Sequence, residues 1–158
     1  MDPVAADLQE TIDPMLLQLQ RLSEEDSTKK PAPGKWSPKE IIGHLIDSAS
    51  NNHQRFVRAQ FQDDLVFSGY EQNDWVAVQR YQQASWSSLL ALWHSFNTHL
   101  VHVIDVAPEA EKHRTRTRHN LDQLAWQAIP ADHPTTLAYF MDDYVGHLKH
   151  HLGQIAPF

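Results

Sequence analysis

The fold is decided by one stretch near the end of the chain, residues 135–155, which reads TTLAYFMDDYVGHLKHHLGQI. Its apolar residues recur at steps of three and four, the spacing that aligns them along one side of an α-helix. They are Leu137, Phe140, Met141, Tyr144, Leu148, Leu152 and Ile155. Thr135 follows Pro134 and is the expected N-cap. The stretch therefore predicts an amphipathic helix that packs one face against the rest of the protein.

Two histidines lie at the edge of this apolar stripe. His147 and His151 are four residues apart, so a helix stacks one above the other, whereas His150 turns away together with Asp143. Two imidazoles at this spacing can bind one metal ion, because both Nε2 atoms reach a common point. The pair is equally compatible with hydrogen-bonded interior histidines or with a solvated helix edge. A third ligand from elsewhere in the chain would favour the metal.

Composition restricts the class of protein. The chain has 158 residues, which predicts a single domain over residues 1–158. Its hydrophobic share of 41% and charged share of 21% are typical of soluble globular proteins. The net charge of −7 argues against a nucleic-acid partner, because binding phosphates requires a basic surface. No apolar stretch resembles a signal peptide or a membrane span, which predicts a cytoplasmic protein without a membrane partner.

The absence of cysteine limits the chemistry further. It excludes disulfides, thiolate metal sites and a cysteine nucleophile. A metal site in this chain must therefore use imidazole and carboxylate ligands, and 11 histidines are available.

Three more helices are expected upstream. Residues 38–62 have the clearest start, because residues 37–40, SPKE, form a capping box with proline at the first helical position. Residues 86–106 carry a second apolar stripe. Residues 4–25 carry a third, in which the helix either begins at Pro14 or continues through it with a kink.

The helix over residues 38–62 has a polar stripe beside its apolar face. The stripe consists of His44, Ser48, Asn51, Arg55 and Arg58. A polar stripe is usually the solvated face of a helix. His44 borders the apolar stripe, however, and a row of histidine, asparagine and arginine can also line a polar cavity.

Four amphipathic helices and a long third connection, residues 107–134, predict an all-α fold, an up-down four-helix bundle with a long crossover connection. Such bundles often hold metals between facing helices. If the second helix packs beside the last, His44 can meet His147 and His151. Three imidazoles that leave a coordination position open are the ligand set of a catalytic zinc-type site rather than a closed structural one.

The same residues resemble a known family. The sequences WSPKE at 36–40, HL at 44–45, HLKHH at 147–151 and QI at 154–155 look like motifs of the DinB/YfiT-like superfamily. The segment HLIDS at 44–48, with Asn51 and Arg55-Phe56 at their present spacing, is most similar to the YfiT-type branch, which includes bacillithiol transferases. The resemblance extends over residues 33–155.

Membership of this family would imply a four-helix bundle, often a homodimer, that binds one divalent ion, zinc or nickel. Carried over by motif, the ligands are His44, His147 and His151. The superfamily contains thiol-dependent S-transferases, an isomerase, proposed hydrolases and members without a known activity. The metal ligands alone therefore do not select a reaction.

The leading prediction is a metal-dependent thiol S-transferase, which joins a low-molecular-weight thiol to an electrophilic small-molecule substrate. Metal coordination favours the thiolate form of such a thiol. Asn51, Arg55 and Arg58 are the expected substrate-binding residues, with the two arginines holding carboxylates of the thiol. The alternative for the arginines is pairing with acidic neighbours such as Asp47.

Two other functions stay open. A metal-dependent hydrolase would use a bound water of lowered pKa and a nearby carboxylate base. Asp47, Asp142 and Asp143 are the candidates for that base, although helical phase turns all three partly away from the histidines. The third possibility is a bundle without enzymatic activity that binds a metal together with a ligand or a partner.

Overall fold

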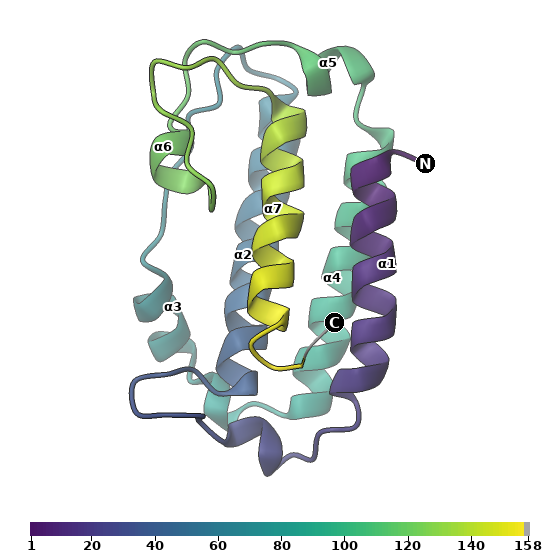
Figure 1. The fold of residues 1–158 in the computed structure, drawn as a ribbon, viewed down its shortest axis with the longest axis vertical. Coiled ribbons are helices and arrows are strands. Elements are labelled where there is room, and N and C mark those ends of the chain that lie inside the picture. The colour runs from purple at the N-terminus through teal and green to yellow at the C-terminus, as the bar shows by residue number, and fades with distance from the viewer. Residues whose placement is uncertain (157–158) are drawn as a thin grey trace.

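Four long helices form a bundle in the computed structural model, which describes residues 1–156 (Figure 1). They are α1 (Pro3–Leu19), α2 (Pro38–Ala59), α4 (Trp86–Val106) and α7 (Leu137–Leu152). The connections contain α3 (Gln72–Gln79), α5 (Glu109–His113), α6 (Leu121–Leu124) and the 3-10 helices η1 (Asp26–Thr28) and η2 (Tyr81–Gln83). Extended pairing within residues 1–156 is limited to two isolated bridges, Leu65 with His119 and Arg116 with Thr135. The predicted all-α four-helix bundle is confirmed.

The directions of the helices explain the long connections. α1 and α7 run one way along the bundle, and α2 and α4 run the other way (Figure 1). Each of α2 and α1 packs against both α4 and α7. Because α2 and α4 are parallel neighbours, the chain needs the crossover at residues 60–85 to return to the start of α4. The crossover was predicted in the third connection, but that connection, residues 107–136, joins α4 to α7 at one end of the bundle (Figure 1).

Capping residues and apolar periodicity in the sequence predicted the starts of α2 and α4. Ser37 Oγ accepts a hydrogen bond from the Glu40 N–H (3.2 Å), and the Glu40 carboxylate accepts one from the Ser37 N–H (3.0 Å), so the capping box is confirmed. α4 spans the predicted residues 86–106. α1 begins just after its N-cap, Asp2, and continues through Pro14, as one of the two alternatives expected, but it ends at Leu19 and not near residue 25.

The last helix begins one residue later than predicted. Its N-cap is Thr136, whose Oγ1 accepts a hydrogen bond from the Tyr139 N–H (3.1 Å). Thr135 cannot take this role because two backbone hydrogen bonds, of 2.8 and 3.0 Å, pair it with Arg116. The helix ends at Leu152, before the end of the quoted stretch.

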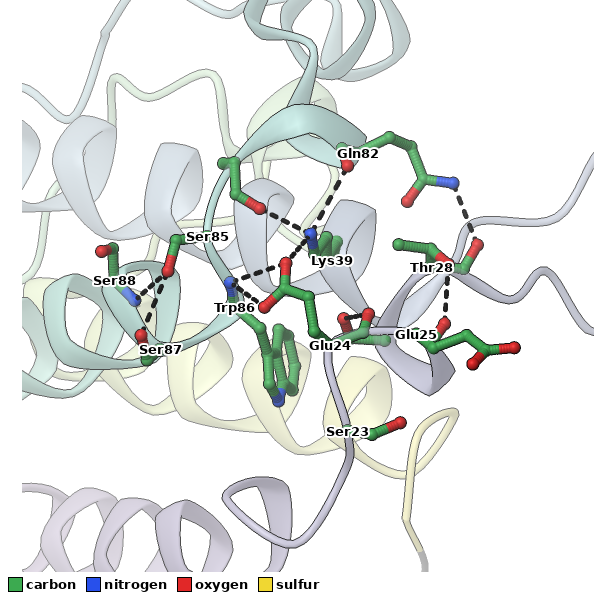
Figure 2. Close-up of polar contacts among 12 residues, drawn as sticks. Ser23, Glu24, Glu25, Thr28, Lys39, Gln82, Ser85, Trp86, Ser87 and Ser88 are labelled. Carbon is green, nitrogen blue, oxygen red and sulfur yellow. Dashed lines mark hydrogen bonds and ion pairs between the residues drawn. The ribbon is translucent and has the colours of Figure 1, made fainter.

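A buried lysine on α2 holds the end of the crossover in place (Figure 2). Lys39 is 2% exposed, and its ammonium contacts the Glu24 carboxylate and the carbonyl oxygens of Ala84 (2.5 Å) and Gln82 (3.4 Å). The Glu24 carboxylate also accepts a hydrogen bond from the backbone N–H of Trp86 (3.0 Å). These contacts hold the first turn of α4 beside the first turn of α2.

Aromatic packing holds α2 and α7 side by side. The ring of Phe56 on α2 meets the rings of Phe140 and Tyr144 on α7 edge-on, at centroid distances of 5.7 and 5.8 Å. Phe56 is fully buried, and edge-to-face pairs of this kind stabilise beyond their buried area. The contact sets the register that brings the histidines of the two helices together. None of the helices described is both long and apolar enough to cross a membrane.

Candidate metal centre

Three histidines from α2 and α7 meet in the bundle interior. The Nε2 atoms of His44 and His147 lie 3.3 Å apart, and His151 completes a group whose ligand atoms all lie within 4.8 Å of one another. The three ring centroids are 4.6 to 5.2 Å apart. Because the ligand atoms converge on one point from two helices, this group can hold a metal ion.

The surroundings keep the histidines in their ligand form. Burial, and to a lesser extent the neighbouring histidines, lowers the pKa of His44 and of His147 from 6.5 to about 3. Burial also lowers the pKa of His151. Neutral imidazole is the form that binds metals, so at neutral pH no proton has to be displaced from these ligands.

A hydrogen bond orients the ring of His151. Its Nδ1 lies 3.0 Å from Gln154 Oε1, and because an amide oxygen only accepts, Nδ1 carries the proton and Nε2 keeps its lone pair. The Trp36 ring lies against His44 and His151, at centroid distances of 4.9 and 6.1 Å. The donor set fits a divalent metal ion that accepts imidazole ligands. Within the described part of the chain the group has three members, as a site with an open coordination position requires.

A cavity of about 770 Å³ lies beside the histidines and has His147 on its wall. The wall also contains Ser48, Asn52 and Arg55 of α2, with Tyr70 from the crossover. The volume is within the range of small-molecule sites, about 300–1,000 Å³. The cavity therefore places polar α2 residues and a candidate metal ligand around one space.

Arg55 is an unusual member of this wall. Its side chain is 6% exposed, and its guanidinium donates to the Ser68 carbonyl (2.9 Å) and to Asn52 Oδ1 (3.4 Å). The Tyr70 ring lies below it, 5.9 Å from the guanidinium carbon. Burial lowers its pKa, yet no carboxylate of residues 1–156 forms an ion pair with it. A buried cation of this kind is suited to bind an anion.

The other two predicted substrate-binding residues lie elsewhere. Asn51 is half-buried, and its amide donates to the Asp47 carbonyl one turn earlier (2.9 Å). Arg58 is exposed, and neither residue is on the cavity wall. The expected acidic neighbour of the arginines, Asp47, is instead bound by Tyr81 and Gln79.

Asp143 corrects a prediction from helical phase. It was predicted to turn away from the histidines together with His150, which is exposed, but Asp143 is 8% exposed and lies on the cavity wall with His147. Its two carboxylate oxygens accept the backbone N–H groups of Trp126 (2.8 Å) and Gln127 (2.7 Å). The third connection folds over this face of α7 and buries it. Periodicity within one helix carries no information about such a distant segment.

Several residues that shape the cavity were not predicted from the sequence. Tyr70 and Trp126 lie in connections that have no periodic pattern, so no local signal identifies them. Gly146 leaves room for Trp126, because a Cβ there would lie 3.0 Å from the indole ring. Asn52 could have been found, since it is one residue from the predicted polar stripe on the inward-facing side of α2.

Comparisons with known proteins agree with this fold. The structure is similar to YfiT from Bacillus subtilis, described as a probable metal-dependent hydrolase with an unusual four-helix bundle topology. The TM-score is 0.77 at 20% sequence identity, over 98% of this chain and 82% of that chain, so the likeness shows a shared fold. No curated protein matches the sequence. Residues 7–155 match the DinB superfamily, and the chain therefore belongs to that superfamily.

Proposed function

We propose that this protein is a metal-dependent enzyme that transfers a low-molecular-weight thiol to an electrophilic small molecule. His44, His147 and His151 would hold one divalent ion, zinc or nickel, because imidazole suits both metals. Such an ion supplies Lewis-acid chemistry that favours the deprotonated form of a thiol. The chain has no cysteine, so the reacting sulfur comes from a co-substrate.

One observation carries this proposal: the buried guanidinium of Arg55 and the imidazole of His147 lie on the wall of one cavity. Low-molecular-weight thiols commonly carry carboxylates, and Arg55 has no carboxylate partner within residues 1–156. A bidentate bond between them would neutralise the buried charge and direct the sulfur toward the histidines. The cavity volume of about 770 Å³ leaves room for the second substrate.

The proposed reaction forms one bond and breaks one bond at the electrophilic carbon. A carbon–sulfur bond forms at the electrophilic carbon while its bond to the leaving group breaks. The leaving group takes the bonding electron pair, and the thiol proton is lost to solvent. In this account Arg55 binds and orients the thiol, and the chain itself supplies no nucleophile.

Hydrolysis is the second candidate, and the likeness to YfiT, described as a probable metal-dependent hydrolase, favours it. A hydrolase needs a carboxylate that accepts a proton from water. On the cavity wall, both oxygens of Asp143 already accept backbone hydrogen bonds, which leaves Glu71. Asp47 and Asp142 are not on the wall. The transferase needs no such base, so we rank it first.

The test compares the two reactions on one protein. Metal-loaded protein is assayed with a panel of cellular thiols and a halogenated dinitrobenzene, and separately with activated esters in the absence of thiol. A transferase conjugates the thiol faster than the solution reaction and loses this activity in His151→Ala. Turnover of esters without any thiol conjugation, together with its loss in Glu71→Gln, would establish the hydrolase instead.

Substitutions at Arg55 test its role in binding the thiol, with Arg58 as the control position. Arg55→Ala should raise the KM for a carboxylate-bearing thiol by about 10- to 100-fold, the value of a charged hydrogen bond. Arg58→Ala removes the same charge from the exposed side of α2 and should leave KM unchanged. Arg55→Lys keeps the charge without the planar fork and should give an intermediate KM. Equal KM values for the Arg55 and Arg58 variants would contradict the anchoring role.

A further inference from the structure

Two polar atoms near the first turns of α2 are buried without a hydrogen-bond partner. They are Nδ1 of His44 and Oδ2 of Asp47. One is a potential donor and the other an acceptor, and unpaired buried groups of this kind are rare because each lowers the stability of the folded protein. They belong to residues three apart on one helix, so their side chains are neighbours on its surface.

The Asp47 carboxylate is held in place from its other side. Tyr81, in η2 at the end of the crossover, donates its hydroxyl to Asp47 Oδ1 (2.6 Å), and the Gln79 amide donates to the same oxygen (2.8 Å). These bonds fix the carboxylate and leave Oδ2 unpaired. The carboxylate is therefore oriented by contacts that do not use its second oxygen.

Gly43 is what allows Tyr81 to reach this position. A Cβ at residue 43 would lie 2.1 Å from a carbon of the Tyr81 ring, so any side chain there would displace the ring. The glycine immediately precedes His44 in α2. The close approach thus places the end of the crossover against the part of α2 that carries His44 and Asp47.

A bound metal would determine which nitrogen of His44 carries the proton. Without metal, the Nε2 atoms of His44 and His147 face each other at 3.3 Å, and one of them carries a proton. A metal takes the lone pairs of both Nε2 atoms, which obliges His44 to carry its proton on Nδ1. A buried Nδ1–H then needs an acceptor.

We infer that Asp47 is a positioning residue for the metal site: its Oδ2 accepts the Nδ1–H of His44, and Tyr81 and Gly43 hold the carboxylate for that purpose. The two atoms do not bond in this structure, and we expect the bond to form when a metal fixes the Nδ1–H tautomer of His44. Carboxylate–histidine pairs of this kind fix the tautomer and raise the basicity of a ligating imidazole. The inference rests on the proposed metal site.

The experiment measures metal affinity rather than activity. Zinc dissociation constants are determined by chelator competition for the wild type, Asp47→Asn, Tyr81→Phe and Asp142→Asn. Asp47→Asn should weaken binding about 10- to 100-fold, the usual cost of losing such a partner. Tyr81→Phe keeps the ring against Gly43 and releases the carboxylate, so it should weaken binding by a smaller factor. Asp142→Asn removes the same charge from an exposed position on α7 and should bind like the wild type.

Long-range proton–nitrogen NMR supplies a second readout that a purely structural role would not change. In the zinc-loaded wild type, the His44 Nδ1–H signal should be protected and shifted by a charged acceptor, and in Asp47→Asn it should lose that shift. The metal-free Asp47→Asn protein should melt at the wild-type temperature.

Wild-type affinity and an unchanged Nδ1–H signal in Asp47→Asn would overturn this inference and leave the proposed function intact. If Asp47→Asn does not fold, the same two measurements on Tyr81→Phe decide the question, and no change there overturns the inference. Absence of zinc binding by the wild type would remove the proposed function as well.

Discussion

His44 and His147 are basic groups held in an environment that favours their neutral form. Burial lowers both pKa values from 6.5 to about 3, so the folded protein does not bind these protons above that pH. The unfolded chain, whose histidines titrate at their ordinary pKa, takes up the protons as the pH falls below about 6.5. Unfolding is then linked to proton uptake, and the metal-free protein loses stability on acidification.

The metal-free protein should therefore be most stable above pH 6.5 with respect to these two groups. Between pH 6.5 and about 3, each histidine should lower the free energy of unfolding by up to about 1.4 kcal/mol per pH unit. Urea unfolding at a series of pH values measures this slope. His147→Gln should reduce the slope, whereas His150→Gln, at an exposed position on the same helix, should not. Identical slopes in all three proteins would contradict the burial argument.

The direction in which a side chain faces was predictable from the sequence where the periodicity of its own helix determines it. Helical phase placed His147 and His151 inward and His44 beside the apolar stripe of α2, and the polar stripe of α2 contained Arg55, which lines the cavity. It misjudged Asp143, because the segment that buries this side chain comes from a connection rather than from α7.

The first turn of α2 is held by a helix cap and by a hydrogen bond to the crossover. Ser37 caps the helix, and its hydroxyl also donates to Gln82 in the crossover (2.8 Å). Ser37 is fully buried, so its loss would leave both Gln82 Oε1 and a helical N–H without a partner. One serine thus combines a local signal with a tertiary contact that the sequence did not reveal.

Ser37→Ala should consequently cost more than the roughly 1 kcal/mol of an ordinary N-cap, about 2 kcal/mol in all. Chemical denaturation of the two proteins measures the difference. Ser85→Ala, which removes the exposed N-cap of α4, is the matched control and should cost nearer 1 kcal/mol. An effect of Ser37→Ala no larger than that of Ser85→Ala would show that the contact with Gln82 contributes nothing.

Elements with strong periodicity and caps were predicted almost to the residue, as α4 and the start of α2 illustrate. The path of the crossover, by contrast, was not predicted. Its path depends on contacts with residues distant in sequence, such as Tyr81 on Gly43 and Lys39 on the carbonyls of Gln82 and Ala84. No pattern within residues 60–85 encodes these contacts.

For the whole molecule, the arrangement of helices determines where chemistry can occur. Parallel packing of α2 and α4 leaves α7 beside α2, so ligands from two helices meet in the interior (Figure 1). The crossover and the third connection supply the other walls of the cavity, through Tyr70 and Trp126. The long connections thus complete a site whose metal ligands all come from the bundle.

The central claim is that His44, His147 and His151 together bind one divalent ion. It is tested by elemental analysis of protein purified without an affinity tag, loaded with zinc and desalted. We expect one ion per chain in the wild type and in His150→Ala, and a sharp loss in His44→Ala, His147→Ala and His151→Ala. Circular dichroism confirms that each variant is folded. Full zinc occupancy in folded His147→Ala would contradict the claim.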